Sequence, residues 1–177
     1  WVVPFTASFE QPCTIGPFAQ IIHAALDAGI GHGALQATLP FIRDHARPWI
    51  DAGVDSAAQD PLLLQQLGNV HVRLRAADAL IARAALTVDA AQRLPTEDSV
   101  AAASVAVAKA KALSTSASLL AGSKLFELGG SGATLAAHGL DRFWRNARVH
   151  TLHDPVRWKY HAVGAYRLNG TLPARHS

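Results

Sequence analysis

The stretch that decides the fold runs from Asp60 to Arg93 and reads DPLLLQQLGNVHVRLRAADALIARAALTVDAAQR. Its apolar residues recur in alternating steps of four and three, at Leu63, Leu67, Val70, Leu74, Ala77, Ile81, Ala84 and Val88. This spacing places one apolar stripe along an α-helix and leaves polar residues on the opposite face. The stretch therefore predicts a long amphipathic helix that buries one side.

Helical patterns continue on both sides of this stretch. Residues 18–50 favour a helix and carry small residues at every fourth position, namely Ala25, Gly29, Gly33 and Ala37. Such a stripe indicates close approach by a neighbouring helix or by a ligand. After Pro95, Thr96 is placed to cap a further helix that runs to about Leu120.

Two more helices are predicted, over residues 134–148 and 156–168, and no two-residue periodicity survives beyond the first dozen residues. Long antiparallel helices joined by short connections are typical of a bundle. The expected fold is all-α, an up-down four-helix bundle over residues 18–177. Residues 1–17 contain three prolines and are expected to form an extended lead-in, a linker from a missing domain.

The composition narrows the class of protein. Half of the 177 residues are apolar, which supports one folded domain, and a net charge of +3 spread along the chain does not indicate nucleic-acid binding. Lys109 and Lys111 interrupt the apolar stretch 99–122, which argues against a membrane span. The lone cysteine, Cys13, excludes an internal disulfide and fits a cytoplasmic location. Because the chain contains no methionine, it is expected to be a piece of a longer protein.

The densest group of functional residue types lies in residues 142–155, RFWRNARVHTLHDP. Arg142, Arg145 and Arg148 share one helix face, where their guanidinium groups could grip phosphates or pair with acidic residues at an interface. A phosphorylated cofactor would use the first arrangement. Arg145 and Arg148 are therefore candidate cofactor-binding residues.

Two histidines in the same group, His150 and His153, are three residues apart, with Asp154 beside them. A metal site would need His161 as a further ligand, but no Glu-x-x-His pattern or cysteine completes it, so no metal is expected. An imidazole is also well suited to proton transfer near neutral pH. The spacing alone leaves proton transfer and structural hydrogen bonding open.

Residues 126–132, FELGGSG, contain a glycine-rich stretch that is either a plain turn between helices or an approach for an anion to backbone N–H groups. Together with residues 141–148, DRFWRNAR, it resembles the acyl-CoA dehydrogenase pattern of a Gly-Gly-x-Gly turn before an Arg-Asp-Ala-Arg/Lys helix. Residues 150–164, HTLHDPVRWKYHAVG, and 168–170, LNG, resemble a narrower branch of that superfamily. This branch contains sulfur-acquisition oxidoreductases and flavin monooxygenases that oxidise dibenzothiophene-type compounds.

The resemblance implies a C-terminal four-helix domain that packs against a helical N-terminal domain and a central β-domain, in a homotetramer. Residues 1–17 would then be the end of that β-domain. The implied cofactor is FAD or FMN. Arg47, in an Arg-Pro-Trp run, matches an arginine that grips the flavin phosphates of a neighbouring subunit. Gly129, Gly130 and Gly132 match the turn that meets the same cofactor.

Departures from the family pattern favour one chemistry over another. Dehydrogenases carry a catalytic glutamate followed by Gly-Thr, where this chain has Asp154-Pro155-Val156, and Phe126 replaces the glutamine before the glycine turn. The shorter aspartate and the proline disfavour abstraction of an acyl-CoA α-proton. In the monooxygenase branch a histidine of this segment lies by the flavin. His153 is therefore the first catalytic candidate and His150 the second, with Asp154 orienting the imidazole.

The predicted function is the C-terminal part of a flavin monooxygenase that oxidises a small organosulfur compound. The enzyme would use O2 and reduced flavin from a separate flavin reductase. One alternative is an acyl-CoA dehydrogenase with Asp154 as the base. Another is a non-catalytic helical oligomerisation module.

Overall fold

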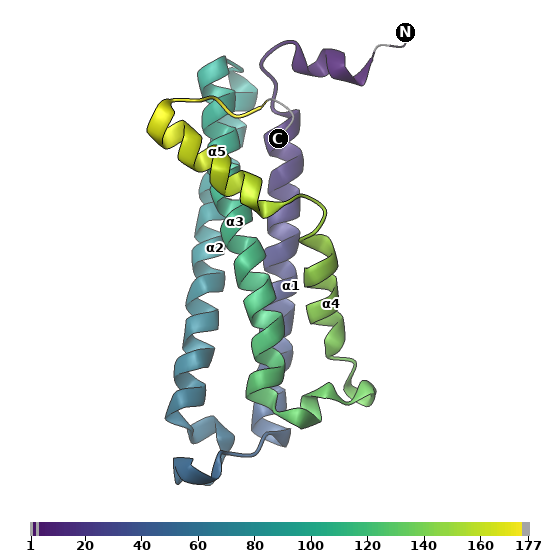
Figure 1. Ribbon diagram of the computed structural model, residues 1–177, viewed down its shortest axis with the longest axis vertical. Coiled ribbons are helices and arrows are strands. Elements are labelled where there is room, and N and C mark those ends of the chain that lie inside the picture. Colours follow the sequence, from purple (N-terminus) through teal and green to yellow (C-terminus); the bar gives the residue numbers. More distant parts are fainter. Residues whose placement is uncertain (1, 3, 175–177) are drawn as a thin grey trace. The chain divides into compact units, whose positions relative to one another are not determined.

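The computed structural model describes Val2 and residues 4–174. Within this described part the regular elements are all helical, as the sequence predicts (Figure 1). The α-helices are α1 (Ile15–His45), α2 (Pro61–Arg93), α3 (Glu97–Gly129), α4 (Asp141–His150) and α5 (Val156–Asn169). Short 3-10 helices are η1 (Phe5–Phe9), η2 (Ile50–Ala52), η3 (Ala57–Gln59), η4 (Ser131–Thr134) and η5 (Ala136–His138).

The chain divides into two compact units, each of which takes segments of α1, α2 and α3. The first unit comprises residues 1–26, 78–113 and 155–177, and therefore contains α5. The second unit comprises residues 27–77 and 114–154, and therefore contains α4.

The second unit is built around an apolar core to which α1, α2 and α3 all contribute. Phe143 of α4 packs against the same core. The four helical segments alternate in direction along the chain (Figure 1), which gives the predicted up-down arrangement. The buried core residues are Ala34, Leu35, Phe41, Val70, Leu74, Ala117, Ala121, Leu125, Ala133 and Leu140.

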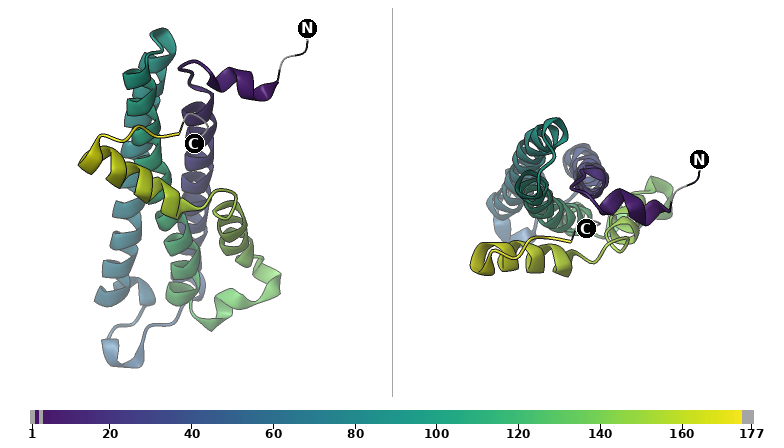
Figure 2. Two further views of the ribbon diagram at one scale, coloured as in Figure 1. Left: turned by 45° about the horizontal axis from the view of Figure 1, so that its top comes forward. Right: turned by 90° about the horizontal axis from the view of Figure 1, so that it is seen from above.

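The first unit has a core of small side chains, as the alanine-rich sequence of its α3 segment predicts. Its buried members are Ala24, Ala84, Val88, Ala91, Ala103, Val107 and Ala110. Small residues let helix axes approach closely and make a compact interface with little side-chain entropy to lose. The fifth helix, α5, crosses the α3 segment of this unit (Figure 2), and its Lys159 is buried.

The periodic stripe of α2 faces inward, as predicted. Val70, Leu74, Ala77, Ala84 and Val88 are all buried, and Leu63, Leu67 and Ile81 are half-buried. Off-stripe leucines such as Leu64 and Leu86 are exposed. The alternation of four- and three-residue steps was therefore sufficient to find the buried face of this helix.

Several element boundaries differ from the sequence prediction. The lead-in is not extended throughout, because residues 5–9 form η1, and α1 begins at Ile15. The predicted helix over 134–148 is replaced by η4, η5 and the shorter α4. Leu135 has an extended backbone and Gly139 has a φ of 57°, so the helical path is broken twice before Asp141.

The small-residue stripe of α1 is packed over only part of its length, where Ala37 lies against the apolar core of the second unit. A Cβ placed on Gly33 would lie 2.9 Å from Cε1 of Phe143, so any larger residue here would require the Phe143 ring of α4 to shift. Ala25 and Gly29 are exposed, with nothing within 4 Å of a Cβ placed on Gly29. A Cβ placed on Gly31, which lies off the stripe, would lie closer still, 2.7 Å from Leu74 Cδ2.

None of the helices in the described part of the chain combines the length and apolar character that a bilayer-spanning segment needs.

The start of α3 offers a direct test of the predicted cap. The Thr96 hydroxyl accepts from the backbone N–H of Ser99 at 3.1 Å, and the Ser99 hydroxyl accepts from the N–H of Thr96 at 2.8 Å. We expect Thr96→Ala to lower the free energy of unfolding by about 1 kcal/mol, because one helix-end N–H loses its acceptor. Urea titration followed by circular dichroism measures this change.

A second threonine supplies the control for this prediction. The Thr87 hydroxyl bonds the Arg83 carbonyl within α2 and caps no helix end. Thr87→Ala should change the free energy of unfolding by less than about 0.5 kcal/mol. Equal losses in the two variants would contradict a capping role for Thr96.

Candidate functional site

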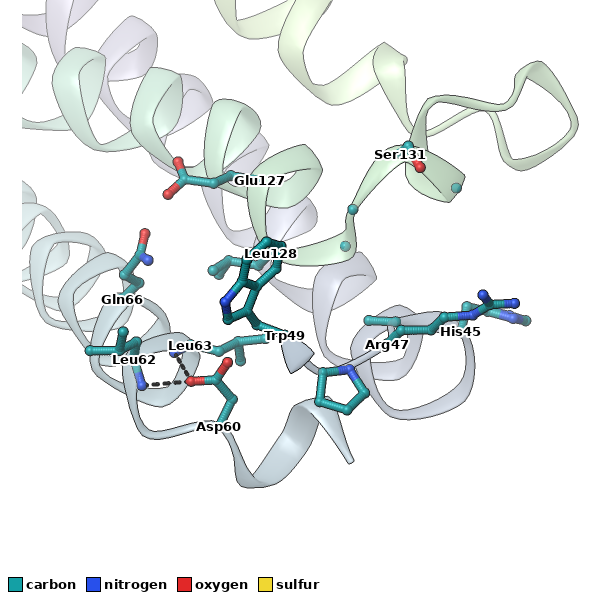
Figure 3. Close-up of a pocket in the computed structure, with 15 residues that line it drawn as sticks. His45, Arg47, Trp49, Asp60, Leu62, Leu63, Gln66, Glu127, Leu128 and Ser131 are labelled. Carbon is teal, nitrogen blue, oxygen red and sulfur yellow. Dashed lines mark hydrogen bonds between the residues drawn. The ribbon is translucent and has the colours of Figure 1, made fainter. Parts of the chain in front are cut away.

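A pocket of about 740 Å³ opens in the second unit where α1 ends, α2 begins and α3 ends (Figure 3). Its walls come from three stretches that are distant in sequence but close in the fold. They are His45, Ala46, Arg47, Pro48 and Trp49, then Asp60, Leu62, Leu63 and Gln66, then Glu127, Leu128, Gly129, Gly130, Ser131 and Gly132. The structure thus brings the sequence candidates Arg47 and the glycine turn into one cavity.

The wall after α1 owes its position to Pro48. Proline disfavours the α conformation of the residue before it, which here is Arg47. The helix accordingly ends at His45, and Arg47 lies in the connection that follows. Trp49 is held by a hydrogen bond from its indole N–H to Asp51 Oδ2 at 3.0 Å and remains largely exposed. The side chains of Arg47 and His45 extend in the same direction in Figure 3.

The glycine turn needs glycine at two positions for different reasons. Gly130 has a φ of 72°, a conformation that side-chain-bearing residues rarely adopt. A Cβ on Gly129 would lie 3.0 Å from the Ala133 Cβ and 3.1 Å from Phe41 Cδ1. At Gly130 nothing lies within 4 Å of such a Cβ, so the backbone of this residue faces open space.

The charges around the pocket are unequally compensated. Asp60 accepts from the backbone N–H groups of Leu62 and Leu63 at 2.8 and 3.2 Å and so caps α2. Glu127 pairs with Lys124 at 2.5 Å. By contrast, the exposed Arg47 guanidinium makes no hydrogen bond or ion pair with any residue that the structure describes. The arginine is therefore available to an anion from outside this chain.

A second group of candidates lies at the end of α4. His150 is partly buried, and its Nδ1 lies 2.5 Å from Oδ1 of Asp27 on α1. The ring of His153 lies nearly parallel to that of His150, at an interplanar angle of 15° and a centroid distance of 6.5 Å. His153 itself is exposed and Asp154 is half-buried.

The three arginines of α4 do not form one cluster of free guanidinium groups. Arg142 donates to the Gly139 carbonyl at 2.7 Å and lies over the Phe143 ring at 4.4 Å from its centroid. Arg145 pairs with Asp141 at 3.0 Å, one turn earlier. Arg148 is exposed. Because the Arg145–Asp141 pair is exposed on both sides, it is weak and can be exchanged for another anion.

Over the described residues, no three side chains of the histidine, cysteine, aspartate or glutamate type are grouped closely enough to share a metal ion.

Residues 21–158 match the family model described as acyl-CoA dehydrogenase, C-terminal domain. The chain belongs to this family.

Relatives of this acyl-CoA dehydrogenase-type domain include monooxygenases. A dibenzothiophene monooxygenase of Rhodococcus erythropolis is 40% identical over an alignment 177 residues long. The alignment covers 98% of this chain and 42% of the relative. A probable FMNH2-dependent monooxygenase, SfnC, of Pseudomonas putida is 36% identical over 159 residues, which cover 88% of this chain and 40% of the relative. The chain thus spans less than half the length of these relatives.

A solved structure shares the fold of this acyl-CoA dehydrogenase-type domain. TdsC from Paenibacillus sp. A11-2, in complex with FMN and indole, superposes with a TM-score of 0.91 and 36% sequence identity. The matched region covers 97% of this chain and 45% of TdsC.

Sequence reasoning missed Asp27 and Thr115. Asp27 is fully buried, and the Thr115 hydroxyl donates to its Oδ2 at 2.8 Å. An aspartate between Leu26 and Ala28 on an apolar helix was the available signal, because a charged side chain on a buried face requires partners. Its partners could not be named, since they come from α3 and α4.

Proposed function

We propose that the chain is the C-terminal part of a flavin-dependent monooxygenase that uses reduced FMN and O2 to oxidise a small organosulfur compound. The carrying observation is the pocket that brings Arg47 and the turn of Gly130 and Gly132 together. The names of the relatives, a dibenzothiophene monooxygenase and an FMNH2-dependent monooxygenase, support the reaction class and favour FMN over FAD.

The pocket fits the phosphate end of a flavin. Arginine presents a planar fork of N–H groups that suits phosphate oxygens, and Arg47 has no competing partner among the described residues. The open backbone at Gly130 lets N–H groups of the turn approach the same anion. Glu127 is compensated by Lys124, so its charge repels a phosphate less than a lone carboxylate would.

The pocket and the histidines belong to different flavins in this proposal. Asp27, the partner of His150, and His45 of the pocket are both on α1, eighteen residues apart, which is about 27 Å along a helix. The ribityl chain of one FMN is too short to connect a phosphate at Arg47 with a ring at His153. Each chain therefore contributes to two sites, which requires a homo-oligomer, and we propose a homotetramer.

In that assembly the histidine segment serves the reacting end of the cofactor. Bound reduced flavin supplies the electrons for splitting O2, with one oxygen atom going to sulfur and the other leaving as water. The exposed imidazole of His153 holds or donates a proton at this point, and Asp154 orients it. Arg145 and Arg148 lie on α4 together with His150, and their positive charges attract the anionic cofactor. A separate flavin reductase supplies the reduced flavin.

We also propose that the protein acts in the cytoplasm, where the free thiol of Cys13 stays reduced.

The test of the cofactor site uses the full-length protein and FMN titration. We expect Arg47→Gln to weaken FMN binding by about 10- to 100-fold, because a charge-assisted hydrogen-bond donor to phosphate is lost. Arg83→Gln removes an exposed arginine of the first unit and serves as the matched control, with unchanged affinity expected. Equal FMN affinity in wild type and Arg47→Gln would contradict the assignment of this pocket.

The test of the reaction follows the oxygen atom. With FMN, a flavin reductase supplied with NAD(P)H, and 18O2, we expect one 18O atom per turnover to enter dibenzothiophene or a related sulfide, as read by mass spectrometry. Bleaching of the flavin by an acyl-CoA under anaerobic conditions, without such labelling, would instead support a dehydrogenase with Asp154 as the base. A full-length protein that binds no flavin at all would support an oligomerisation module.

A further inference from the structure

Asp27 is a buried carboxylate whose two oxygens are both occupied. Its side chain is fully buried. Oδ2 accepts from the Thr115 hydroxyl at 2.8 Å, and Oδ1 lies 2.5 Å from Nδ1 of His150. An ionised carboxylate only accepts hydrogen bonds, so two such contacts suit the charged form. Burial of that charge is tolerated because these donors replace water.

The charged form of Asp27 dictates where His150 carries its proton. A carboxylate oxygen at hydrogen-bond distance requires a donor on Nδ1. In the neutral imidazole the proton is then on Nδ1, and Nε2 keeps its lone pair. A buried aspartate on α1 therefore selects one of the two tautomers of a histidine on α4.

The surroundings of α4 make this contact a rigid anchor. A Cβ on Gly122 of α3 would lie 3.1 Å from the Cα of Trp144, and a Cβ on Gly33 of α1 would lie 2.9 Å from Cε1 of Phe143. Ala147, one turn before His150, is fully buried. With α4 pressed against both helices, the Asp27 contact fixes the remaining freedom of the His150 ring.

His153 follows the anchor directly. Its backbone N–H donates to the His150 carbonyl at 3.1 Å, in the turn that ends α4. The two imidazole planes are 15° apart. The backbone position of His150 thus holds the turn from which the exposed His153 projects.

We propose that Asp27 is a positioning residue: it holds His150 as the neutral Nδ1–H tautomer and, through His150, fixes the segment that carries His153. The consequence for turnover rests on the proposed function, whereas the tautomer of His150 does not. Asp27 acts through His150 and touches no substrate in this assignment.

The first measurement reads the tautomer without any turnover. Full-length protein labelled with 15N-histidine is sedimented at pH 8 and studied by solid-state NMR, with the His150 signals identified by their loss in His150→Gln. Wild type should show a protonated Nδ1 and an unprotonated Nε2. In Asp27→Asn the amide can donate to Nδ1, so the proton should move to Nε2. A wild-type spectrum with a protonated Nε2 overturns the proposal, even if no Asp27 variant folds.

The second measurement separates positioning from general structural damage. We expect Asp27→Asn to lower kcat for sulfur oxidation by about 10- to 100-fold, the effect typical of residues that orient a functional group, with KM changed less than twofold. Asp89→Asn makes the same chemical change at an exposed carboxylate of α2 and should leave both values unchanged. Unchanged kcat in a folded Asp27→Asn protein whose tautomer has switched would overturn the link to His153. If neither protein oxidises sulfur while the tautomer result holds, the proposed function fails and the assignment of the tautomer stands.

Discussion

His153→Gln should lower kcat of the full-length enzyme by about 10²- to 10⁴-fold, the range that a positioned general acid or base contributes. Glutamine keeps hydrogen-bonding capacity and similar length but cannot exchange a proton near neutral pH. FMN affinity should stay within twofold of wild type, because the proposed phosphate pocket lies at the far end of the second unit's α1 segment. Stopped-flow turnover and FMN titration measure the two quantities.

A matched histidine variant controls this result. His71 of α2 is exposed, and His71→Gln should leave kcat unchanged. A His153→Gln enzyme that retains more than half of the wild-type kcat would exclude His153 from the chemistry. In that event a large loss in His150→Gln would move the assignment to the second candidate.

Gly122→Val should lower the free energy of unfolding by about 1–3 kcal/mol or more, because the added side chain has no space. Even a Cβ alone would lie 3.1 Å from the Cα and 3.4 Å from the N of Trp144, and the backbone of α4 cannot turn away as a flexible side chain could. The same displacement of α4 should weaken the Asp27–His150 contact, so kcat should fall as well. Urea titration and the turnover assay measure these effects.

Gly68→Val is the matched control for this overpacking. Gly68 is exposed on α2, and nothing lies within 4 Å of a Cβ placed there. Valine and glycine differ little in helix propensity, so the free energy of unfolding should change by less than about 0.5 kcal/mol. A Gly122→Val protein as stable as Gly68→Val would show that α4 can move away from α3 at no cost.

The sequence predicted the parts of the fold that depend on local patterns. The stripe through Leu74 located the buried face of α2, and Thr96 located the start of α3, because periodicity and capping act over one or two turns. The break at Gly139 escaped prediction. A glycine at this spacing is compatible with a helix interior, and only the packing around it selects the positive φ.

Only the parts of the candidate site that lie in short sequence motifs were predicted. Arg47 and the glycine turn were identified separately by resemblance, and the fold brings them into one pocket. No local motif marks Asp27 as a functional residue, because its side chain contacts Thr115 and His150, which are 88 and 123 residues away in the sequence. A pairing of this kind depends on how three helices pack and leaves no short-range signal in the sequence.

The long separation between Asp27 and His150 also has a consequence for synthesis of the protein. At about 5–20 residues per second, a ribosome needs on the order of ten seconds to add the residues between them. Throughout that interval the nascent chain carries the Asp27 side chain without the contact that His150 supplies. Full burial of the carboxylate with this contact in place is possible only after α4 has been made.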